Sequence, residues 1–491
     1  MFRAVISLAT SCTDRRTVVA LAACLGAAYA YFYQAGGWNQ NSRFALVRAI
    51  VEERTLRIDD TARVNGRLIT GDLAWHDGHV YSDKAPGLAL TAAPIVAIAR
   101  PFVADPSSPK GIATLSYLAT VITAGLPTVL TAVMLFALAR RLGATRAGGA
   151  FASAVFGLGS PAWCYATLFY GHALATACLV GAFLAAVALG DPSDRRRDGL
   201  LAAAVGFGGG WATVAEYPTV VAAAMIALLA IANTSAEGGA RRARVAIVIA
   251  VSALACAAVL AWFNRATLGS ATELGYRHVA LFEGMSEGFL GVTYPKRGVL
   301  IELLVGQYRG LLFLSPVFAA APIGFLLLLV RSNRPAALTA GAIAAYFVLF
   351  NASYHYWDGG WSYGPRHMAC SLPFLSLALA PLWSVAKPIL RTGLAVIALY
   401  GAGLTLVAVS TTAQPPDTYK RPVTQLLWEN FSQGRLSIHR QSYLEDNLQI
   451  ERNPDTHARN IGERLGLDGL ASLAPLFVTW GAVGFAWRRR R

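Results

Sequence analysis

Apolar runs of about 20 residues recur from one end of this 491-residue sequence to the other, and they constrain its fold more than any other feature. A run of that length crosses the hydrocarbon core of a bilayer as an α-helix. The composition agrees, because 55% of the residues are hydrophobic and only 14% are charged, too few to cover a soluble protein of this length. The sequence therefore predicts an all-α polytopic membrane protein.

Basic residues fall in short connections between these runs, where they predict the orientation of the chain. The clusters are Arg3, Arg15 and Arg16; Arg140, Arg141 and Arg146; Arg195 to Arg197; Arg241, Arg242 and Arg244; Arg331 and Arg334; Lys387 and Arg391; and Arg488 to Arg491. Lys and Arg in short loops stay on the cytoplasmic side, so these connections and both termini are expected there. The net charge of +15 then reflects membrane orientation, and no nucleic-acid partner is expected.

With those connections inside, about 12 transmembrane helices are expected. They lie near residues 17–34, 112–138, 148–166, 172–189, 199–215, 218–233, 245–263, 311–330, 336–351, 368–385, 389–409 and 469–487. The apolar segment 87–104 is short and contains two prolines and Arg100. A full span there would move the Arg140 cluster outside, so we expect a re-entrant or interface-lying helix.

The expected spans divide the chain into three parts. Residues 1–409 form a transmembrane domain that includes a long first extracytoplasmic loop with interfacial helices, 35–111. Residues 410–468 are polar and form either a small external cap or a mobile lid. Residues 469–491 form the last transmembrane helix and a basic cytoplasmic tail.

The stretch "GHVYSDKAPGLAL" (78–90) places Asp83 and Lys84 where the first loop meets an apolar run. A cation just outside hydrocarbon can hold a lipid-linked phosphate and stabilise it as it leaves. A carboxylate on the opposite side can take the proton of an acceptor hydroxyl, the geometry that inversion at a sugar carbon requires. The same residues also fit a simple helix start, with Ser82 or Asp83 as N-cap and Pro86 in the first turn.

Other outer segments carry further candidates. In "YHYWDGGWSYGPRH" (354–367), aromatic faces beside polar groups suit a sugar ring and a guanidinium suits phosphate, although Tyr and Trp also form interfacial belts. "YPKRG" (294–298) is either a phosphate site or a solvated turn with two snorkelling cations. The candidates from these segments and from the span ends are Trp357, Asp358, Trp361, Arg366, Arg297, His172 and Glu216. The spacing of His and acidic residues matches no specific metal site.

Two motifs resemble those of the GT-C superfamily of membrane glycosyltransferases. The likeness is to the polyprenyl-phosphate-dependent branch that contains aminoarabinose transferases and protein mannosyltransferases, in which a Tyr-x-acid-Lys-Pro-Pro motif opens the helix closing the first loop. "YSDKAPG" (81–87) resembles that motif, which aligns Asp83 with its acid and Lys84 with its phosphate-contacting Lys. In "NSRFALVRAI" (41–50), Arg43 matches the family's Arg, and "WDGGWSYGPRH" (357–367) resembles a segment common in bacterial members.

One departure from the family pattern concerns the catalytic Asp that usually follows the first span. Gln40 and Asn41 occupy those acidic positions in "NQNSR" (39–43), and an amide cannot act as a base. Asp72 and Asp83 are therefore the candidates for the base, with Asp59 and Asp60 behind them.

The resemblance implies an inner-membrane enzyme that moves a sugar from a polyprenyl-phosphate donor to a glycan, lipid or protein acceptor on the outer face, with inversion. Its implied partners are membrane lipid, the donor and the acceptor. The implied donor-phosphate ligands are Lys84, Arg43, Arg366 and Arg297, and the implied sugar or acceptor ligands are Tyr81, Trp357, Asp358, Trp361, His172 and Glu216. A twelve-span transporter or lipid flippase and an inactive GT-C-like scaffold remain as alternatives. A transporter is expected to carry ionisable groups near the membrane midplane, whereas here they gather at the outer ends.

Overall fold

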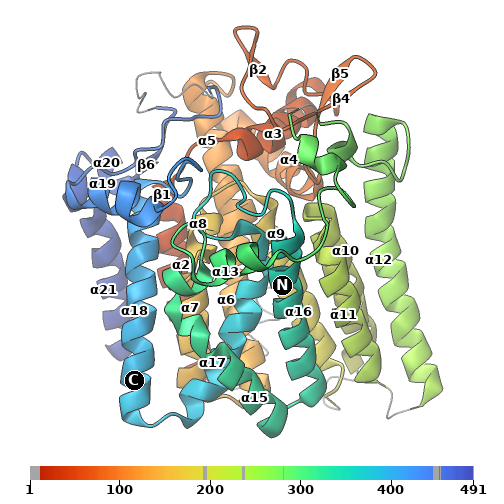
Figure 1. Ribbon diagram of the computed structural model, residues 1–491, viewed down its shortest axis with the longest axis vertical. Coiled ribbons are helices and arrows are strands. Elements are labelled where there is room, and N and C mark those ends of the chain that lie inside the picture. The colour runs from red at the N-terminus through yellow and green to blue at the C-terminus, as the bar shows by residue number, and fades with distance from the viewer. Residues whose placement is uncertain are drawn as a thin grey trace.

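The computed structural model describes residues 12–191, 196–234, 238–279, 281–445, 453 and 455–489. Its long apolar runs form a bundle of helices, and its polar segments form an irregular layer over one end of that bundle (Figure 1). Arg3, Arg195, Arg490 and Arg491 of the basic clusters lie outside the described residues.

The bundle begins with α2 and ends with α21. Its helices are α2 (Cys12–Tyr31), α5 (Pro109–Thr120), α6 (Leu126–Arg141), α7 (Arg146–Gly157), α8 (Ala162–Ala166), α9 (Gly171–Ala188), α10 (Asp198–Ala215), α11 (Thr219–Ala232), α12 (Gly239–Leu268), α14 (Leu311–Leu314), α15 (Ala321–Arg331), α16 (Arg334–Ser353), α17 (Leu372–Val385), α18 (Pro388–Thr411) and α21 (Ala474–Arg489). A π-helical turn, Val121–Gly125, joins α5 to α6, and 3-10 turns Pro316–Ala320, Arg366–Ser371 and Gly469–Leu473 precede α15, α17 and α21.

Seven helical stretches in the described part of the chain are long and apolar enough to cross a membrane. They are Pro109–Arg141, Gly171–Ala188, Gly239–Leu268, Arg334–Ser353, Arg366–Val385, Pro388–Thr411 and Gly469–Arg488, and shorter apolar helices lie at Gly87–Phe102, Thr219–Ala232 and Pro316–Arg331. These helices confirm a multi-pass membrane protein. The count of twelve spans remains a prediction, although every expected range overlaps a helix.

Two expected spans are broken rather than continuous. The range 148–166 divides into α7 and α8 at Pro161, and the range 311–330 is interrupted before Pro316. Proline has no backbone N–H to donate, so each break falls where the regular ladder of helix hydrogen bonds loses a donor.

The short basic connections share the end of the bundle opposite the polar layer, where hydrogen bonds link one turn to another. Ser332 Oγ donates to the Leu142 carbonyl at 2.8 Å, and the Thr145 amide donates to Ser384 Oγ at 2.9 Å. Figure 1 shows the α15–α16 and α17–α18 turns together at this end. The charge sorting expected from the sequence is therefore present in space; which side of the membrane this end faces stays a prediction.

The first loop is an ordered part of the polar layer. It contains α3 (Trp38–Arg48), a π-helical turn (Ala49–Glu53), two small hairpins, β2–β3 (Arg63–Val64, Arg67–Leu68) and β4–β5 (Leu73–His76, His79–Ser82), and α4 (Gly87–Ala99), which continues as a 3-10 turn, Arg100–Phe102. His76 pairs with His79 across the turn of β4–β5, where Asp77 and Gly78 both have positive φ. An Asp-Gly pair is the typical choice for such a two-residue turn.

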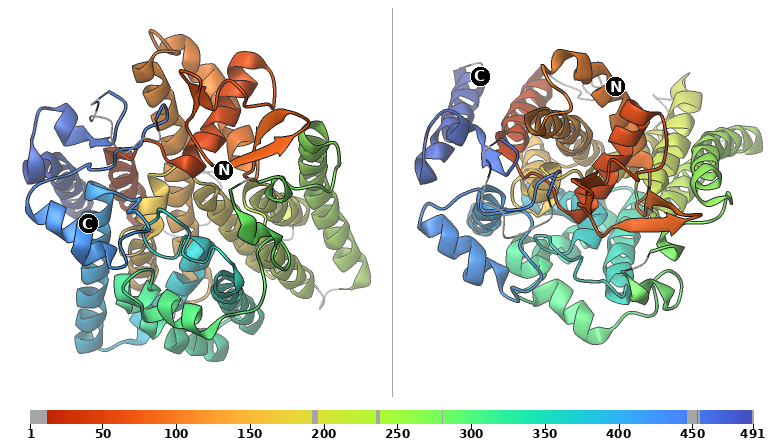
Figure 2. Two further views of the ribbon diagram at one scale, coloured as in Figure 1. Left: turned by 45° about the horizontal axis from the view of Figure 1, so that its top comes forward. Right: turned by 90° about the horizontal axis from the view of Figure 1, so that it is seen from above.

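The segment 410–468 also folds onto the polar layer in its described part, as a cap would. β1 (Phe32–Tyr33), directly after α2, pairs with β6 (Arg459–Asn460). The segment further contains a π-helical turn (Val423–Leu427), α19 (Trp428–Ser432) and α20 (Ile461–Arg464). Seen from above in Figure 2, the first loop lies between this blue segment and the green segment that holds α13 (Arg297–Val305) and the 3-10 turns Gly275–Arg277 and Glu283–Ser286.

Candidate active site

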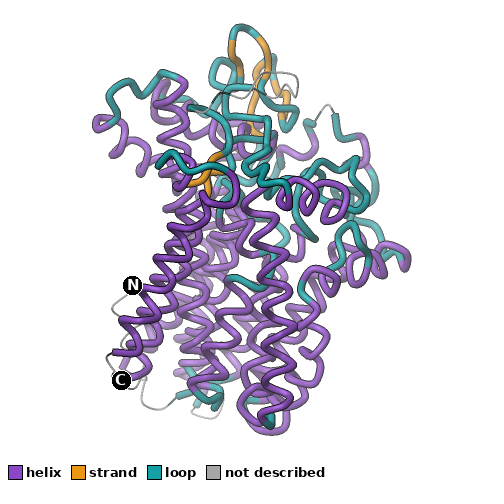
Figure 3. Tube along the Cα trace, turned by 90° about the vertical axis from the view of Figure 1, so that its left-hand side faces the viewer, coloured by secondary structure: helices purple, strands orange, loops and turns teal. Residues whose placement is uncertain are grey.

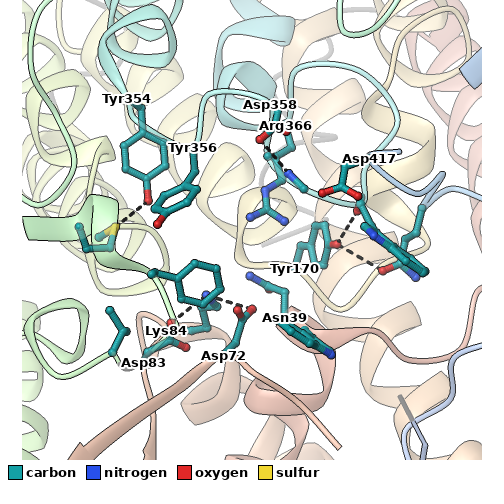
Figure 4. Close-up of a pocket in the computed structure, with 18 of the residues that line it drawn as sticks. Asn39, Asp72, Asp83, Lys84, Tyr170, Tyr354, Tyr356, Asp358, Arg366 and Asp417 are labelled. Carbon is teal, nitrogen blue, oxygen red and sulfur yellow. Dashed lines mark hydrogen bonds and ion pairs between the residues drawn. The ribbon is translucent and has the colours of Figure 1, made fainter. Parts of the chain in front are cut away.

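A cavity of about 520 Å³ lies under the polar layer, where segments far apart in the sequence meet (Figure 4). Its lining residues are Trp38, Asn39, Asp72, Asp83, Lys84, Tyr170, Tyr276, Val279, Phe282, Met285, Tyr354, Tyr356, Asp358, Gly359, Gly360, Trp361, Arg366, Gln414, Asp417 and Gln441. The volume falls within the range of small-molecule sites, and convergent charged groups in a largely apolar wall are typical of them.

Lys84 lies between two carboxylates at one side of this cavity. Its Nζ is 2.9 Å from Asp83 Oδ2 and 3.0 Å from Asp72 Oδ2. The β4–β5 hairpin produces this arrangement, because Leu73 pairs with Ser82 and the residues one step beyond are then neighbours. We call these three residues the carboxylate–lysine cluster.

Burial controls the charges of this cluster. Asp83 is 2% exposed, and its pKa is raised to about 6, first by burial and then by the charge of Asp72, while the Lys84 cation opposes the shift. Burial alone would lower the pKa of Lys84, but the Asp72 and Asp83 carboxylates outweigh it and the pKa is raised. Lys84 therefore stays charged at neutral pH, and Asp83 ionises near the pH at which a general base works best. Asp83 Oδ1 is buried and accepts no hydrogen bond from any residue that the structure describes.

Arg366 points into the cavity from the side opposite the carboxylate–lysine cluster (Figure 4). Its guanidinium carbon lies 5.6 Å from the centre of the Tyr170 ring, a cation–π distance. Its buried Nε has no hydrogen-bond partner, and it forms no ion pair with a carboxylate in the described part of the chain. Unlike Lys84, this cation is available to an anion that enters the cavity.

The outer wall of the cavity comes from Tyr276, Val279, Phe282 and Met285, which lie between α12 and α13. Phe282 and Tyr276 place their rings 5.7 Å and 6.0 Å from Lys84 Nζ. Backbone pairing of Ala74 with Val279 fixes this segment to β4, and the Tyr356 hydroxyl accepts a hydrogen bond from the Gly284 amide at 3.1 Å. The aromatic rings exclude water from one side of the cluster, which strengthens its electrostatic interactions.

Arg43 and Glu216 form a second buried ion pair behind the cavity wall. Arg43 Nη2 donates to Glu216 Oε1 at 2.8 Å, Nη1 donates to the Ala85 carbonyl at 3.0 Å, and Nε donates to Asn39 Oδ1 at 3.0 Å. His172 lies beside them, with its Nδ1 3.6 Å from Glu216 Oε1. None of these three predicted residues lines the cavity. We call Arg43 and Glu216 the closed pair.

The structure separates the remaining predicted residues into two groups. Asp358 and Trp361 line the cavity together with Asp72, Asp83, Lys84 and Arg366. Tyr81 is buried within β5, Trp357 packs edge-on against Tyr308, and Arg297 is exposed at the start of α13. Asp59, one of the secondary candidates, accepts from the Val80 amide at 2.7 Å and pairs with His79, at the far end of the hairpin from the cavity wall.

The amides at the family's acidic positions are structural here. Gln40 Oε1 accepts from the Phe169 amide at 2.8 Å, and Asn41 Nδ2 donates to the carbonyls of Ile69 and Ser442. Their neighbour Asn39 lines the cavity instead, together with Trp38. The sequence motif therefore indicated the right turn of α3 but not the side chain that faces the cavity.

Sequence reasoning also missed a buried cation that holds the glycine turn beside Asp358. Arg309 is fully buried and donates to the carbonyls of Gly360 and Ser362, while Tyr308 donates to Asp358 Oδ2 at 3.2 Å. Gly359 and Gly360 both have positive φ, which permits the turn. "YRG" (308–310) sits between apolar runs, and a lone Arg there is the signal that would have identified it.

Within the described residues, no group of three or more His, Cys, Asp or Glu side chains has the arrangement of a metal site.

Comparisons with known proteins identify the fold. No family model matches the sequence, and no curated protein sequence does. Two solved structures of ArnT from Cupriavidus metallidurans do match. The complex with undecaprenyl phosphate is 16% identical, with a TM-score of 0.50, and the match covers 86% of this chain and 70% of that chain. The apo state is also 16% identical, with a TM-score of 0.50, and the match covers 85% of this chain and 70% of that chain. The oligosaccharyltransferase AglB from Archaeoglobus fulgidus, with an inhibitory peptide and a dolichol-phosphate, matches at 12% identity over 90% and 62%, with a TM-score of 0.47, too low to carry an argument.

The ArnT match concerns the arrangement of the chain, since the identity is low. The fold is similar to that of ArnT, which agrees with the GT-C resemblance of the motifs at 41–50 and 81–87.

Proposed function

We propose that this protein with a GT-C fold is an integral membrane glycosyltransferase that moves a sugar from a polyprenyl-phosphate donor to a glycan, lipid or protein acceptor. The observation that carries the proposal is the cavity itself, in which two groups face each other without a partner among the described residues: the Asp83 Oδ1 oxygen, which accepts no hydrogen bond, and Arg366, which forms no ion pair with a carboxylate. Transfer of a sugar from phosphate requires both groups, one to accept a proton and one to hold the leaving anion.

Arg366 is the proposed anchor of the donor phosphate. A guanidinium presents a planar set of donors that matches phosphate oxygens, and among the described residues Arg366 forms no ion pair with a carboxylate. The ArnT structure with the same fold holds undecaprenyl phosphate, which supports a lipid-linked donor for this chain. The aromatic wall and the Asp358–Trp361 turn supply the faces and hydrogen-bond acceptors that a sugar ring requires.

Asp83 is the proposed general base. It takes the proton from the acceptor hydroxyl or amide as the acceptor atom bonds to the anomeric carbon. The bond from that carbon to the donor phosphate breaks, and its electron pair leaves with the phosphate. Attack and departure on opposite faces invert the configuration of the sugar. Asp72 raises the pKa of this base, and Lys84 holds both carboxylates in place across the cavity from the leaving anion.

The proposed site lies on the outer face of the inner membrane. The cavity is at the bundle end opposite the basic turns, and basic turns remain cytoplasmic in proteins of this kind. A sugar linked to a membrane lipid can be presented at this face, so the reaction does not require a soluble nucleotide sugar there.

The test is a transfer assay with the purified protein in lipid vesicles. Wild type receives a panel of labelled polyprenyl-phosphate sugars with a crude envelope fraction as acceptor, and the label is followed into the acceptor. Transfer by at least one donor supports the enzyme. Donor retention without transfer across the panel would favour a binding scaffold, and sugar movement across the vesicle without bond formation would favour a transporter.

A further inference from the structure

A groove of about 380 Å³ lies between α2 and α21 at the basic end of the bundle, far from the cavity. The two helices run side by side at the edge of the molecule (Figures 1 and 3). Arg15 and Arg16 line the groove at its polar end, and Val19, Ala20, Ala23, Val483, Ala486 and Trp487 line the rest.

The groove exists because the side chains with which α2 and α21 face each other become smaller toward one end of the pair. Nearer the middle of the bundle, Trp480 fills the space between the helices and donates from Nε1 to the Cys24 carbonyl at 3.0 Å. Toward the basic end, the facing residues include Ala20, Ala23 and Ala486, which are too small to close the gap. The apolar walls of this hollow face the level of the acyl chains.

The charge at the mouth of the groove is positive. Arg15 and Arg16 are exposed, and Arg488 is exposed at the end of α21. Asp14, the acid next to them in the sequence, is 2% exposed, and its Oδ2 lies 3.5 Å from Arg140 Nε. An apolar slot with guanidinium groups at its mouth complements a molecule that has an acyl chain and an anionic head.

We propose that this groove binds one anionic phospholipid, with an acyl chain between α2 and α21 and its phosphate against Arg15 and Arg16. Trp487 lies at the interfacial level, where its ring suits the boundary between head and chain. The chain's own residues 1–11 are a less suitable occupant, because their one charged side chain, Arg3, is positive. The bound lipid would stabilise the packing of α2 against α21, the first and last helices of the bundle.

The experiment is native mass spectrometry of the protein released from nanodiscs that contain phosphatidylglycerol or phosphatidylcholine. Wild type is expected to retain one phosphatidylglycerol molecule after delipidation and to exchange it poorly for phosphatidylcholine. Arg15→Gln/Arg16→Gln should hold it about 30-fold more weakly, since each Arg near an anionic head group contributes about 1 kcal/mol and 1.4 kcal/mol is tenfold. Arg331→Gln/Arg334→Gln removes an equal charge from the α15–α16 turn and should retain the lipid.

A second variant tests the slot without a change in charge. Ala20→Leu/Ala23→Leu fills the groove and should also lose the lipid. Three results would overturn the proposal. The filled variant could retain phosphatidylglycerol as well as wild type does, or wild type could retain phosphatidylcholine as well as phosphatidylglycerol. The third is an equal loss of phosphatidylglycerol in Arg15→Gln/Arg16→Gln and Arg331→Gln/Arg334→Gln. Binding that appears only after residues 2–11 are removed would assign the groove to the N-terminal segment and overturn it as well.

Discussion

Two buried ion-pair systems lie within one layer of this protein, and they differ in what their carboxylates face. The carboxylate–lysine cluster opens on the cavity, and in the described part of the chain Asp83 Oδ1 has no hydrogen-bond partner. The closed pair, Arg43 and Glu216, lies behind the wall, where Arg43 is held by Asn39, Ala85 and Glu216. Both systems pair a cation with a carboxylate, so residue type alone does not distinguish a reactive group from a structural one. The difference lies in access to the cavity and in unsatisfied hydrogen-bonding capacity.

The largest effect is expected from Asp83→Asn. The substitution keeps the shape of the side chain but removes its ability to accept a proton, so turnover should fall about 10³-fold with donor binding retained. Initial transfer rates and donor retention measure the two separately. Asp77→Asn, the matched control in the exposed turn of the same hairpin, should transfer at the wild-type rate; a loss shared by both variants would count against a role for Asp83 as base.

Glu216→Gln should act on stability instead. It leaves the Arg43 guanidinium buried without its counter-charge, and breaking a buried pair in this way costs about 3 kcal/mol. Thermal unfolding in detergent should show a lower midpoint, with transfer per folded molecule largely preserved. Glu52→Gln disrupts the more exposed Arg48–Glu52 pair and should change the midpoint little. A transfer defect in Glu216→Gln at unchanged stability would place Glu216 in the reaction.

Arg366→Gln should weaken donor binding about 100-fold, because it removes the charged donor that faces the cavity without a carboxylate partner. Arg297→Gln removes the same charge from an exposed position outside the cavity wall, and it should leave donor affinity unchanged. Retention of a labelled polyprenyl-phosphate sugar measures both. Equal weakening in the two variants would mean that the donor phosphate lies nearer α13 than the cavity.

The smallest effect is expected from Asp72→Asn on the pH profile. The Asp72 charge raises the pKa of Asp83, so its removal should lower that pKa and shift the acid limb of the transfer profile to lower pH. In wild type the acid limb should lie near pH 6, with activity lost as Asp83 becomes protonated below it. An unchanged acid limb in Asp72→Asn would show that another group controls it.

Sequence patterns predicted residues of the candidate site but not the hairpin that joins them. Asp72 and Asp83 were identified as candidates from the first loop and its "YSDKAPG" motif. In the structure, the Asp77-Gly78 turn fixes the pairing of β4 with β5, and that pairing makes Asp72 and Asp83 neighbours on either side of Lys84. The apolar runs likewise predicted the helices, because their length and hydropathy are properties of each run alone.

The parts that depend on contacts between distant segments were not predictable in this way. Gln414 and Asp417 line the cavity although the segment 410–468 had been expected only as a cap or lid. Phe282 reaches Lys84 from a loop without a distinctive motif. Arg43 matched a family motif, yet tertiary packing pairs it with Glu216, 173 residues away.

The most direct test of the account is a structure of the protein in nanodiscs with a bound polyprenyl phosphate. The account predicts density for the phosphate inside the cavity, in contact with the Arg366 guanidinium and across the cavity from the carboxylate–lysine cluster. Phosphate density at Arg43 behind the wall, at Arg297 on α13, or anywhere that leaves the cavity empty would contradict it.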